Sequence, residues 1–533
     1  MTENKLSIKN LFIELTGLAT GLYTAFILLL MPFYFTEGFC HIGTDKSDFF
    51  VKLTKTAAWV FVPMLLLCLG LVIADTLINK KSIKDWKIKL PDIFVFMYGV
   101  SIILSYFLSD YREEALFGAV QWYMGLFTKL AFVILYFLIS RTYFSVKDKV
   151  VKPHIYLIMA YAASFVVYCL GYLNRFGIFP IDMKVENVLF LSTIGNINWY
   201  CGYMMPLLFS AIALFVIKDD LKPIYEILLQ VYIFAGFLTF ATQGSRSALV
   251  GAYVAVITLL FISYKNEKRM DRMLRLMMMF GISCGVTYII TLFPIQGVEL
   301  TFSDSLYDWL TIYPTGIGIM ALALILRGAL ATYTEKKGYP EKLFKWLTYG
   351  ITGLSIGGFV LFISLIWANT KNPGCLGKLS NISIFTFDPT WSSNRGATWM
   401  AGFMSFGEQN FVHKLFGIGP DCMCEFIKAK ASPRIHTLLS ETFGNLVLTN
   451  AHNELLTNLL NQGIFGMVAF LGMVITAIRE LIRTHKDKKK AAAIAIGIVA
   501  YFANNMVSFE QVMGGVTFYI VMGLGMRMVN EEN

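Results

Sequence analysis

Apolar runs of about 20 residues alternate with short polar segments along most of the chain, and a run of that length can cross a bilayer as one α-helix. Prolines, glycines and clusters of charged residues separate the runs, as is typical of helix boundaries. The pattern predicts an all-α polytopic membrane protein. The expected spans, about fourteen by this length criterion, lie near residues 11–35, 57–78, 91–109, 121–140, 153–173, 197–217, 223–242, 246–264, 276–293, 310–330, 346–368, 455–478, 491–508 and 513–529.

One segment, 369–454, interrupts this pattern and contains several prolines and glycines. Connections longer than about 12–15 residues are usually functional or disordered. This one is rich in Trp, Phe, Leu and Ile, which disfavours disorder, so we expect short helices folded against the membrane face. The chain then divides into N-terminal spans (1–190), a core of spans with a polar corner (191–368), this loop, and C-terminal spans (455–533).

Composition agrees with the pattern and bears on partners. The chain is 56% hydrophobic and 15% charged, with a mean hydropathy of +0.61, whereas soluble domains are about 45–50% apolar and about 25% charged. A net charge of +10 could indicate nucleic acid. However, the basic residues gather in one alternate set of loops, which the positive-inside rule assigns to the cytoplasm. We therefore expect a lipid bilayer as partner and no nucleic acid, with both termini cytoplasmic and segment 369–454 extracytoplasmic.

The cysteines and carboxylates give only weak indications of a metal or a disulfide. The eight cysteines have no zinc-site spacing, and Cys375 and Cys422 could pair if their loop is extracytoplasmic. Asp388, Asp421 and Glu454 could in principle bind a divalent cation. Because no DxD or similar spacing supports such a site, we expect no metal and no cofactor.

The corner "TQGSRS" places Arg246 where one apolar run ends and the next begins. A charged side chain inside a bilayer is costly, so such residues usually face a polar cavity. Gly244, Ser245 and Ser247 keep the corner compact, and the start of the following helix attracts anions. An arginine there adds a fork of donors suited to phosphate. The alternative is an interfacial anchor that reaches toward lipid headgroups.

A second arginine, Arg395, lies in "WSSNRGATWMAGFMSF". The preceding residues Ser392–Asn394 are expected to cap a helix. Trp399, Phe403 and Phe406 recur at roughly helical spacing, which favours an amphipathic helix on the membrane surface. The alternative for Arg395 is an ordinary solvated arginine.

His452 lies in a polar cluster, "TNAHNELLTNLLNQG", directly before another span. Asn450, Glu454, Asn458 and Gln462 are four residues apart and share one helix face. This face must contact protein or water rather than lipid. His452 titrates near neutrality and could act as a base or donate a hydrogen bond to phosphate. The alternative is a histidine that caps the helix or forms a hydrogen bond at the membrane interface.

Four further residues are candidates for substrate binding at the same face of the membrane. Arg175 lies in "NRFGIF" and Asn198 in "STIGNINWYCGYM", where a helix is expected to begin. Asp421 follows the Gly-Pro turn of "LFGIGPDCMCEF", and Asn453 neighbours the histidine. No nucleotide-binding or hydrolase motif occurs in a credible context.

Together, "TQGSRSALVG", "NRGATWMAGFMSF", "FGIGPD", "AHNELLTNLLNQGIFGMVAFLG" and, more weakly, "STIGNINWYCGYM" resemble the O-antigen ligase family, which includes related polysaccharide polymerases. The resemblance covers roughly residues 190–530. It implies a GT-C-type glycosyltransferase of the bacterial cytoplasmic membrane that takes a glycan from undecaprenyl diphosphate without a metal. It also implies that Arg246 and Arg395 hold the donor diphosphate and that His452 assists the acceptor hydroxyl or the phosphate.

The sequence departs from this family in three respects and leaves alternatives open. The family's ligases commonly have fewer spans, residues 1–190 carry no family signature, and Asp421 stands where glycine is frequent. A ligase and a repeat-unit polymerase therefore both remain, with a glycan, a lipid or a protein as acceptor. A transporter would instead require paired charges deep within spans, and Lys129 is the one clear basic residue inside a span. The oligomeric state is not predicted.

Overall fold

The computed structural model describes residues 8–78, 88–141, 145–146, 149–150, 152–185, 187–293, 305–446, 448–483 and 489–530. Helices dominate this part of the chain, which confirms the prediction of an all-α membrane protein. The strands are β1 (Ser145–Val146), β2 (Lys149–Val150), β3 (Phe190–Leu191) and β4 (Gly195–Asn196). They form two separate antiparallel pairs, β1 with β2 and β3 with β4.

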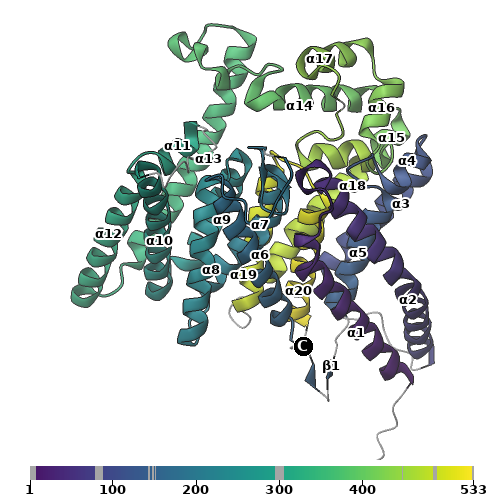
Figure 1. Ribbon diagram of the computed structural model, residues 1–533, viewed down its shortest axis with the longest axis horizontal. Coiled ribbons are helices and arrows are strands. Elements are labelled where there is room, and N and C mark those ends of the chain that lie inside the picture. Colours follow the sequence, from purple (N-terminus) through teal and green to yellow (C-terminus); the bar gives the residue numbers. More distant parts are fainter. Residues whose placement is uncertain are drawn as a thin grey trace, which may run out of the picture.

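The long helices form one bundle (Figure 1). In chain order they are α1 (Ile8–Leu29), α2 (Ile42–Ile78), α3 (Leu90–Leu108), α5 (Leu126–Arg141), α6 (His154–Asn174), α7 (Ile197–Ile217), α8 (Pro223–Thr242), α9 (Arg246–Ser263), α10 (Glu267–Leu292), α12 (Thr315–Lys337), α13 (Glu341–Lys371), α18 (Glu454–Arg483), α19 (Lys489–Asn505) and α20 (Val512–Asn530). Short helices α4 (Arg112–Phe117) and α11 (Ser305–Thr311) lie in connections between them.

Eleven helices of the described part are long and apolar enough to cross a membrane, compared with the roughly fourteen spans predicted from hydropathy. The other three predicted spans, 57–78, 121–140 and 491–508, fall on α2, α5 and α19. Of these, α5 has 16 residues and α19 has 17, which is shorter than any of the eleven. Helix length therefore accounts for α5 and α19, whereas α2 has 37 residues and its length does not explain why it is not among the eleven.

The centre of the bundle is formed by α7, α19 and α20. Almost the whole apolar window of α7 and of α20 is buried inside the protein. A close approach at Gly497 joins α19 to α7, because a Cβ atom there would lie 2.3 Å from the Pro206 carbonyl oxygen. Small residues allow such close packing between membrane helices. By contrast, α12 and α13 stand at one side of the bundle with most of their apolar surface exposed (Figure 1).

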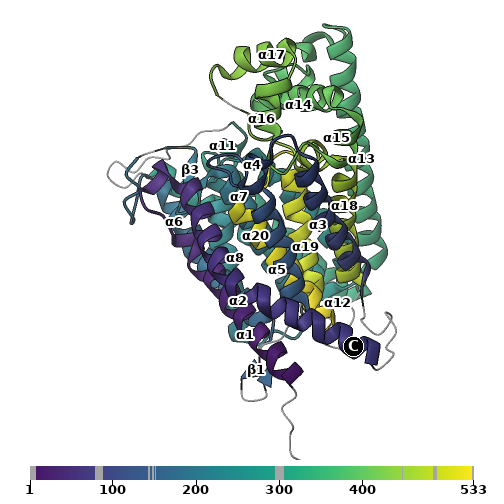
Figure 2. The same ribbon diagram turned by 90° about the vertical axis from the view of Figure 1, so that its right-hand side faces the viewer.

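Short helices between α13 and α18 cover one end of the bundle, as both views show (Figures 1 and 2). We call this unit, residues 372–453, the cap, and the end that it covers the capped end. Its helices are η4 (Gly377–Asn381), η5 (Ser383–Phe385), α14 (Trp391–Glu408), α15 (Phe411–Phe416), α16 (Met423–Lys430) and α17 (Pro433–Phe443). This content matches the short helices expected for segment 369–454.

The predicted aromatic stripe of α14 is divided between the inside and the outside of the cap. Trp399 and Phe406 pack against a buried apolar cluster that α14, α16 and α17 share with Leu456 and Leu460 of α18. Only Phe403, which is 60% exposed, presents its ring to the surroundings. The stripe therefore serves mainly to fix the cap on α18, rather than to coat a membrane surface.

The two cysteines that could have paired are free thiols in the structure. The Cys422 side chain is buried, and its Sγ contacts the carbonyl oxygens of Tyr111 and Pro420. Cys375 is exposed in the connection after α13. The fold thus gives no disulfide between the start and the middle of the cap.

Candidate functional site

The polar corner between α8 and α9 lies at a helix start. Gly244 has φ +87°, a conformation that glycine adopts without strain. The Ser245 hydroxyl donates to Asn198 Oδ1 at 2.8 Å, so the predicted residue Asn198 lies beside the corner. Arg246 is the first residue of α9 and is exposed. Its guanidinium therefore adds positive charge to a helix N-terminus, which already favours anions.

Arg175 supports this corner from inside the protein. The residue is 1% exposed. Its Nη1 donates to the Val188 carbonyl and its Nη2 to the Gln243 carbonyl, both at 2.6 Å. Burial lowers the pKa of Arg175 to about 10, so the guanidinium stays charged at neutral pH. Arg175 therefore has a structural role, because the protein encloses the side chain, and substrate binding by this residue stays a prediction.

Arg175→Met is expected to lower the free energy of unfolding, because the Val188 and Gln243 carbonyls lose their charged donor. A buried polar group left without its partner costs about 1–3 kcal/mol. Thermal unfolding in detergent should show a lower Tm, while Arg434→Met, at an exposed position of α17, should leave Tm unchanged. An unchanged Tm with weakened donor binding would instead return Arg175 to the substrate site.

Arg395 follows a sharp break at the start of α14. Ser392, Ser393 and Asn394 have φ of 52°, 59° and 66°, so they are left-handed residues and not the helix caps that the sequence predicted. Three consecutive left-handed non-glycine residues are strained, and such strain is typically retained at functional sites. The Arg395 Nε donates to the Val507 carbonyl at 2.8 Å, and Nη1 donates to the Ser392 carbonyl at 3.0 Å.

His452 lies in the turn between the cap and α18, with φ 50°. Its backbone N–H donates to Asn450 Oδ1 at 3.1 Å. Its ring meets the Phe509 ring edge to face, with 4.8 Å between centroids. The buried Nδ1 has no hydrogen-bond partner among the described residues. The imidazole is thus held by packing, and its polar atoms are not used to stabilise the turn.

Asn453, and not His452, caps α18. The Asn453 Oδ1 accepts a hydrogen bond from the Leu456 N–H at 2.9 Å, and its Nδ2 donates to the Met506 carbonyl at 2.8 Å. Both ends of this side chain are therefore used inside the protein. This arrangement removes the capping role as an explanation for His452 and gives Asn453 a structural task, while a substrate contact of Asn453 stays a prediction.

The two arginines and the histidine come from distant parts of the sequence and influence one another. Burial and the nearby charge of Arg395 lower the pKa of His452 to about 4. Burial and the charge of Arg246 lower the pKa of Arg395. Each arginine therefore lies within electrostatic range of the next group, and the imidazole is neutral at pH 7. At the capped end, the two arginines are suited to bind an anionic ligand. The neutral imidazole is suited to accept a proton from a group beside that ligand.

Asp421 joins the cap to the connection between α4 and α5. Its carboxylate Oδ2 accepts hydrogen bonds from the backbone N–H groups of Ala119 at 2.8 Å and Met124 at 3.1 Å. Burial raises the pKa of Asp421 to about 7, and the two backbone hydrogen bonds oppose this shift. The residue is 7% exposed. Asp421 therefore acts as a tie between two segments, and a substrate contact at this residue stays a prediction.

This pKa predicts a pH-dependent effect of Asp421→Asn. Between about pH 4 and pH 7 the folded protein retains a proton that the unfolded chain has released, so stability falls as pH rises through this window. Asparagine removes this effect and can still accept hydrogen bonds. The difference between the Tm of the variant and the Tm of wild type should therefore be more positive at pH 8 than at pH 5. An equal difference at both pH values, or the reverse order, would contradict the buried tie.

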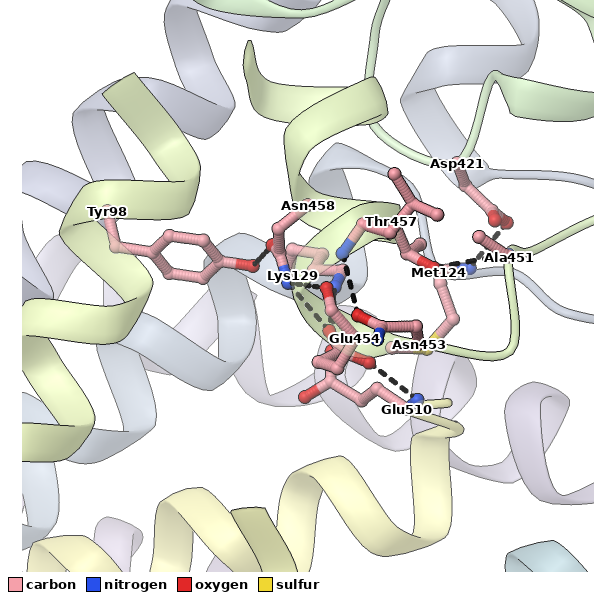
Figure 3. Close-up of polar contacts among 11 residues, drawn as sticks. Tyr98, Met124, Lys129, Asp421, Ala451, Asn453, Glu454, Thr457, Asn458 and Glu510 are labelled. Atoms are coloured by element: carbon pink, nitrogen blue, oxygen red, sulfur yellow. Dashed lines mark hydrogen bonds and ion pairs between the residues drawn. The ribbon is translucent and has the colours of Figure 1, made fainter. Parts of the chain in front are cut away.

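Two residues after His452, Glu454 forms a group of three buried charged residues with Lys129 and Glu510, which we call the Lys129 cluster (Figure 3). Asn458 Nδ2 donates to Glu454 Oε1 at 2.8 Å, and the Tyr98 hydroxyl donates to Asn458 Oδ1 at 2.7 Å. The polar stripe of α18 thus faces protein at these positions.

The sequence indicated Lys129 and Glu454 as candidates but did not indicate Glu510 or Phe509. The only signal for these was the polar stretch "SFEQ" between two apolar runs.

Another carboxylate that the sequence offered as a cation ligand, Asp388, is occupied by local hydrogen bonds. The Asp388 Oδ1 accepts hydrogen bonds from the N–H and hydroxyl of Thr390 and so closes a local turn. Within the described ranges, no group of three His, Cys, Asp or Glu residues is arranged to hold a metal ion.

No protein-family model matches the chain, and no curated protein sequence matches it significantly.

Proposed function

We propose that the protein is a membrane glycosyltransferase that moves a glycan from undecaprenyl diphosphate to an acceptor at the outer face of the bacterial cytoplasmic membrane. The observation that supports this most strongly is that Arg395 and His452 contact the same connection between α19 and α20, through Val507 and Phe509, while the charge of Arg246 is near enough to lower the pKa of Arg395. By the positive-inside rule, the capped end faces away from the cytoplasm. The helices of the bundle give the polyprenyl chain its apolar surroundings.

In this proposal, Arg246 and Arg395 hold the donor diphosphate. When the bond between the anomeric carbon and the phosphate oxygen breaks, negative charge grows on the leaving undecaprenyl diphosphate. Arginine binds such oxygens with charge-assisted, often bidentate hydrogen bonds that are about twice as strong as neutral ones. Because the Arg395 guanidinium is already held by the Val507 and Ser392 carbonyls, it needs little reorganisation as the charge develops.

His452 accepts the proton of the acceptor hydroxyl as the acceptor oxygen bonds to the anomeric carbon. A base must be unprotonated to do this, and the lowered pKa of His452, about 4, provides a neutral imidazole at physiological pH. The proton ends on the imidazole, the glycan on the acceptor, and the electron pair of the broken bond on the diphosphate. No metal is required for this balance.

A transporter is the alternative that the Lys129 cluster brings forward, because transporters contain paired charges within their spans. However, Glu454 is the first residue of α18, Lys129 is the fourth residue of α5, and Glu510 lies in the turn before α20. The charges thus lie at helix starts near the capped end rather than at the middle of the bundle. This position favours chemistry at the membrane surface over translocation.

The direct test is transfer by the purified protein in proteoliposomes that contain an undecaprenyl-diphosphate glycan. A lipid acceptor and a second copy of the donor, offered separately, distinguish a ligase from a polymerase. We expect a heavier acceptor and one undecaprenyl diphosphate released for each glycan transferred, and no transfer from the corresponding monophosphate donor. Movement of the intact donor across the bilayer without bond cleavage would overturn the proposal in favour of a transporter.

A further inference from the structure

The Lys129 cluster has no direct part in the proposed transfer chemistry, although it is costly to bury. Lys129 Nζ lies 2.7 Å from Glu510 Oε2 and 3.8 Å from Glu454 Oε1. Lys129, Glu454 and Glu510 are 5%, 1% and 8% exposed. Buried charges need close pairing and additional hydrogen bonds, and replacement by apolar residues often stabilises a protein. A cluster of this kind next to a candidate site therefore indicates a role other than stability.

The cluster connects the start of α18 to the turn between α19 and α20, residues 506–511. The Glu454 Oε2 accepts a hydrogen bond from the backbone N–H of Glu510 at 2.7 Å. Next to it, Asn453 Nδ2 donates to the carbonyl of Met506 at 2.8 Å. The Glu510 side chain then turns back to Lys129 on α5. Three helix starts are thereby fixed relative to one another.

The 506–511 turn contacts both Arg395 and His452, which have different roles in the proposed chemistry. The carbonyl of Val507 accepts the Nε hydrogen bond of Arg395. The ring of Phe509 packs against the imidazole of His452, and Phe509 also contacts Trp122 at 5.2 Å between centroids. Any displacement of the turn therefore moves Arg395 and His452 relative to one another.

We propose that Lys129 and Glu510, together with Glu454, are positioning residues: their ion pairs hold the 506–511 turn and so fix the imidazole of His452 beside the guanidinium of Arg395. The effect of these residues on glycan transfer rests on the proposed function. Their effect on the position of His452 is independent of that function and can be measured without any substrate.

Two substitutions break the 2.7 Å pair from either side, Lys129→Met and Glu510→Gln. A matched control is Lys89→Met, which removes another lysine–glutamate pair, with Glu480 at 2.9 Å, near the far end of α18. Lys129→Arg keeps the charge and serves as the conservative variant. Where Glu510→Gln does not fold, Glu510→Asp carries the same test, since it keeps the charge but shortens the reach to Lys129.

The first readout is the rate at which diethyl pyrocarbonate modifies His452, followed by mass spectrometry of the 450–460 peptide. Release of the turn should expose the imidazole and raise this rate about threefold or more in Lys129→Met and Glu510→Gln. Lys89→Met should match wild type, and Lys129→Arg should lie close to it. An unchanged rate in both folded pair-breaking variants would overturn the inference.

The second readout is the kinetics of glycan transfer. Misplacement of a base should lower kcat by about 10- to 100-fold while KM for the donor stays within about threefold, because the diphosphate contacts remain. An equal loss in Lys89→Met would reduce the effect to general destabilisation and contradict a positioning role. If the wild-type protein transfers no glycan, the proposed function fails, and the modification rate of His452 alone decides the inference.

Discussion

Arg395→Ala is expected to lower kcat/KM for glycan transfer by about 10²–10³-fold, the usual loss when one fixed donor to a developing anion is removed. The effect should be this large because Arg395 is half-buried and its guanidinium is anchored by the Val507 and Ser392 carbonyls. Transfer measured with purified protein and an undecaprenyl-diphosphate glycan checks this value.

Two companion variants separate charge from geometry in that experiment. Arg395→Lys keeps one positive charge but loses the planar fork, so it should recover only part of the activity. Arg434→Ala removes an exposed arginine of α17 within the same cap and should retain wild-type transfer. Near-normal activity of Arg395→Ala would show that the diphosphate is held elsewhere.

His452→Ala is expected to reduce kcat by about 10²–10⁴-fold, the usual contribution of a positioned general base. KM for the donor should change little, because the arginines that we propose to bind the diphosphate remain. Wild-type transfer should also be nearly independent of pH from about 5 to 8 and should fall only near pH 4, where the imidazole becomes protonated.

The pH dependence of transfer distinguishes a buried histidine from an exposed one. An exposed histidine would lose its basic form below about pH 6.5. An acidic limb at pH 6–7 would therefore mean that His452 is not the base, or that it lies in more polar surroundings than described. His413, which is buried in α15 and bonded to Asn410, provides a control histidine in the cap. His413→Gln should leave the position of the acidic limb unchanged.

Helix boundaries could be predicted wherever a proline, a capping residue or a charge borders an apolar run. The predicted spans 197–217 and 223–242 coincide with α7 and α8, because Asn196 caps the first and Pro223 begins the second.

The start of α2 could not be predicted from the hydropathy pattern. It begins at Ile42 and includes the fully buried Lys46, whose ammonium donates to backbone carbonyls before the helix: those of Met31, Pro32 and Tyr34.

The candidate site was only partly predictable, for a similar reason. Arg246, Arg395 and His452 were noticeable because polar groups are rare and costly in such an apolar chain. What each group contacts depends on residues far away in the sequence. Lys129 was noticed, but its partner Glu510 follows 381 residues later. Arg175 was assigned to substrate because backbone carbonyls, its actual partners, carry no sequence signal.

We propose that two arginines and a histidine converge on one lipid-linked diphosphate at the extracytoplasmic end of the bundle. An experimental structure with undecaprenyl-diphosphate glycan bound tests this proposal most directly. We expect phosphate oxygens within hydrogen-bond distance of Arg246 and Arg395, with the anomeric carbon facing His452. A diphosphate bound away from both arginines, or at the end of the bundle opposite the cap, would contradict it.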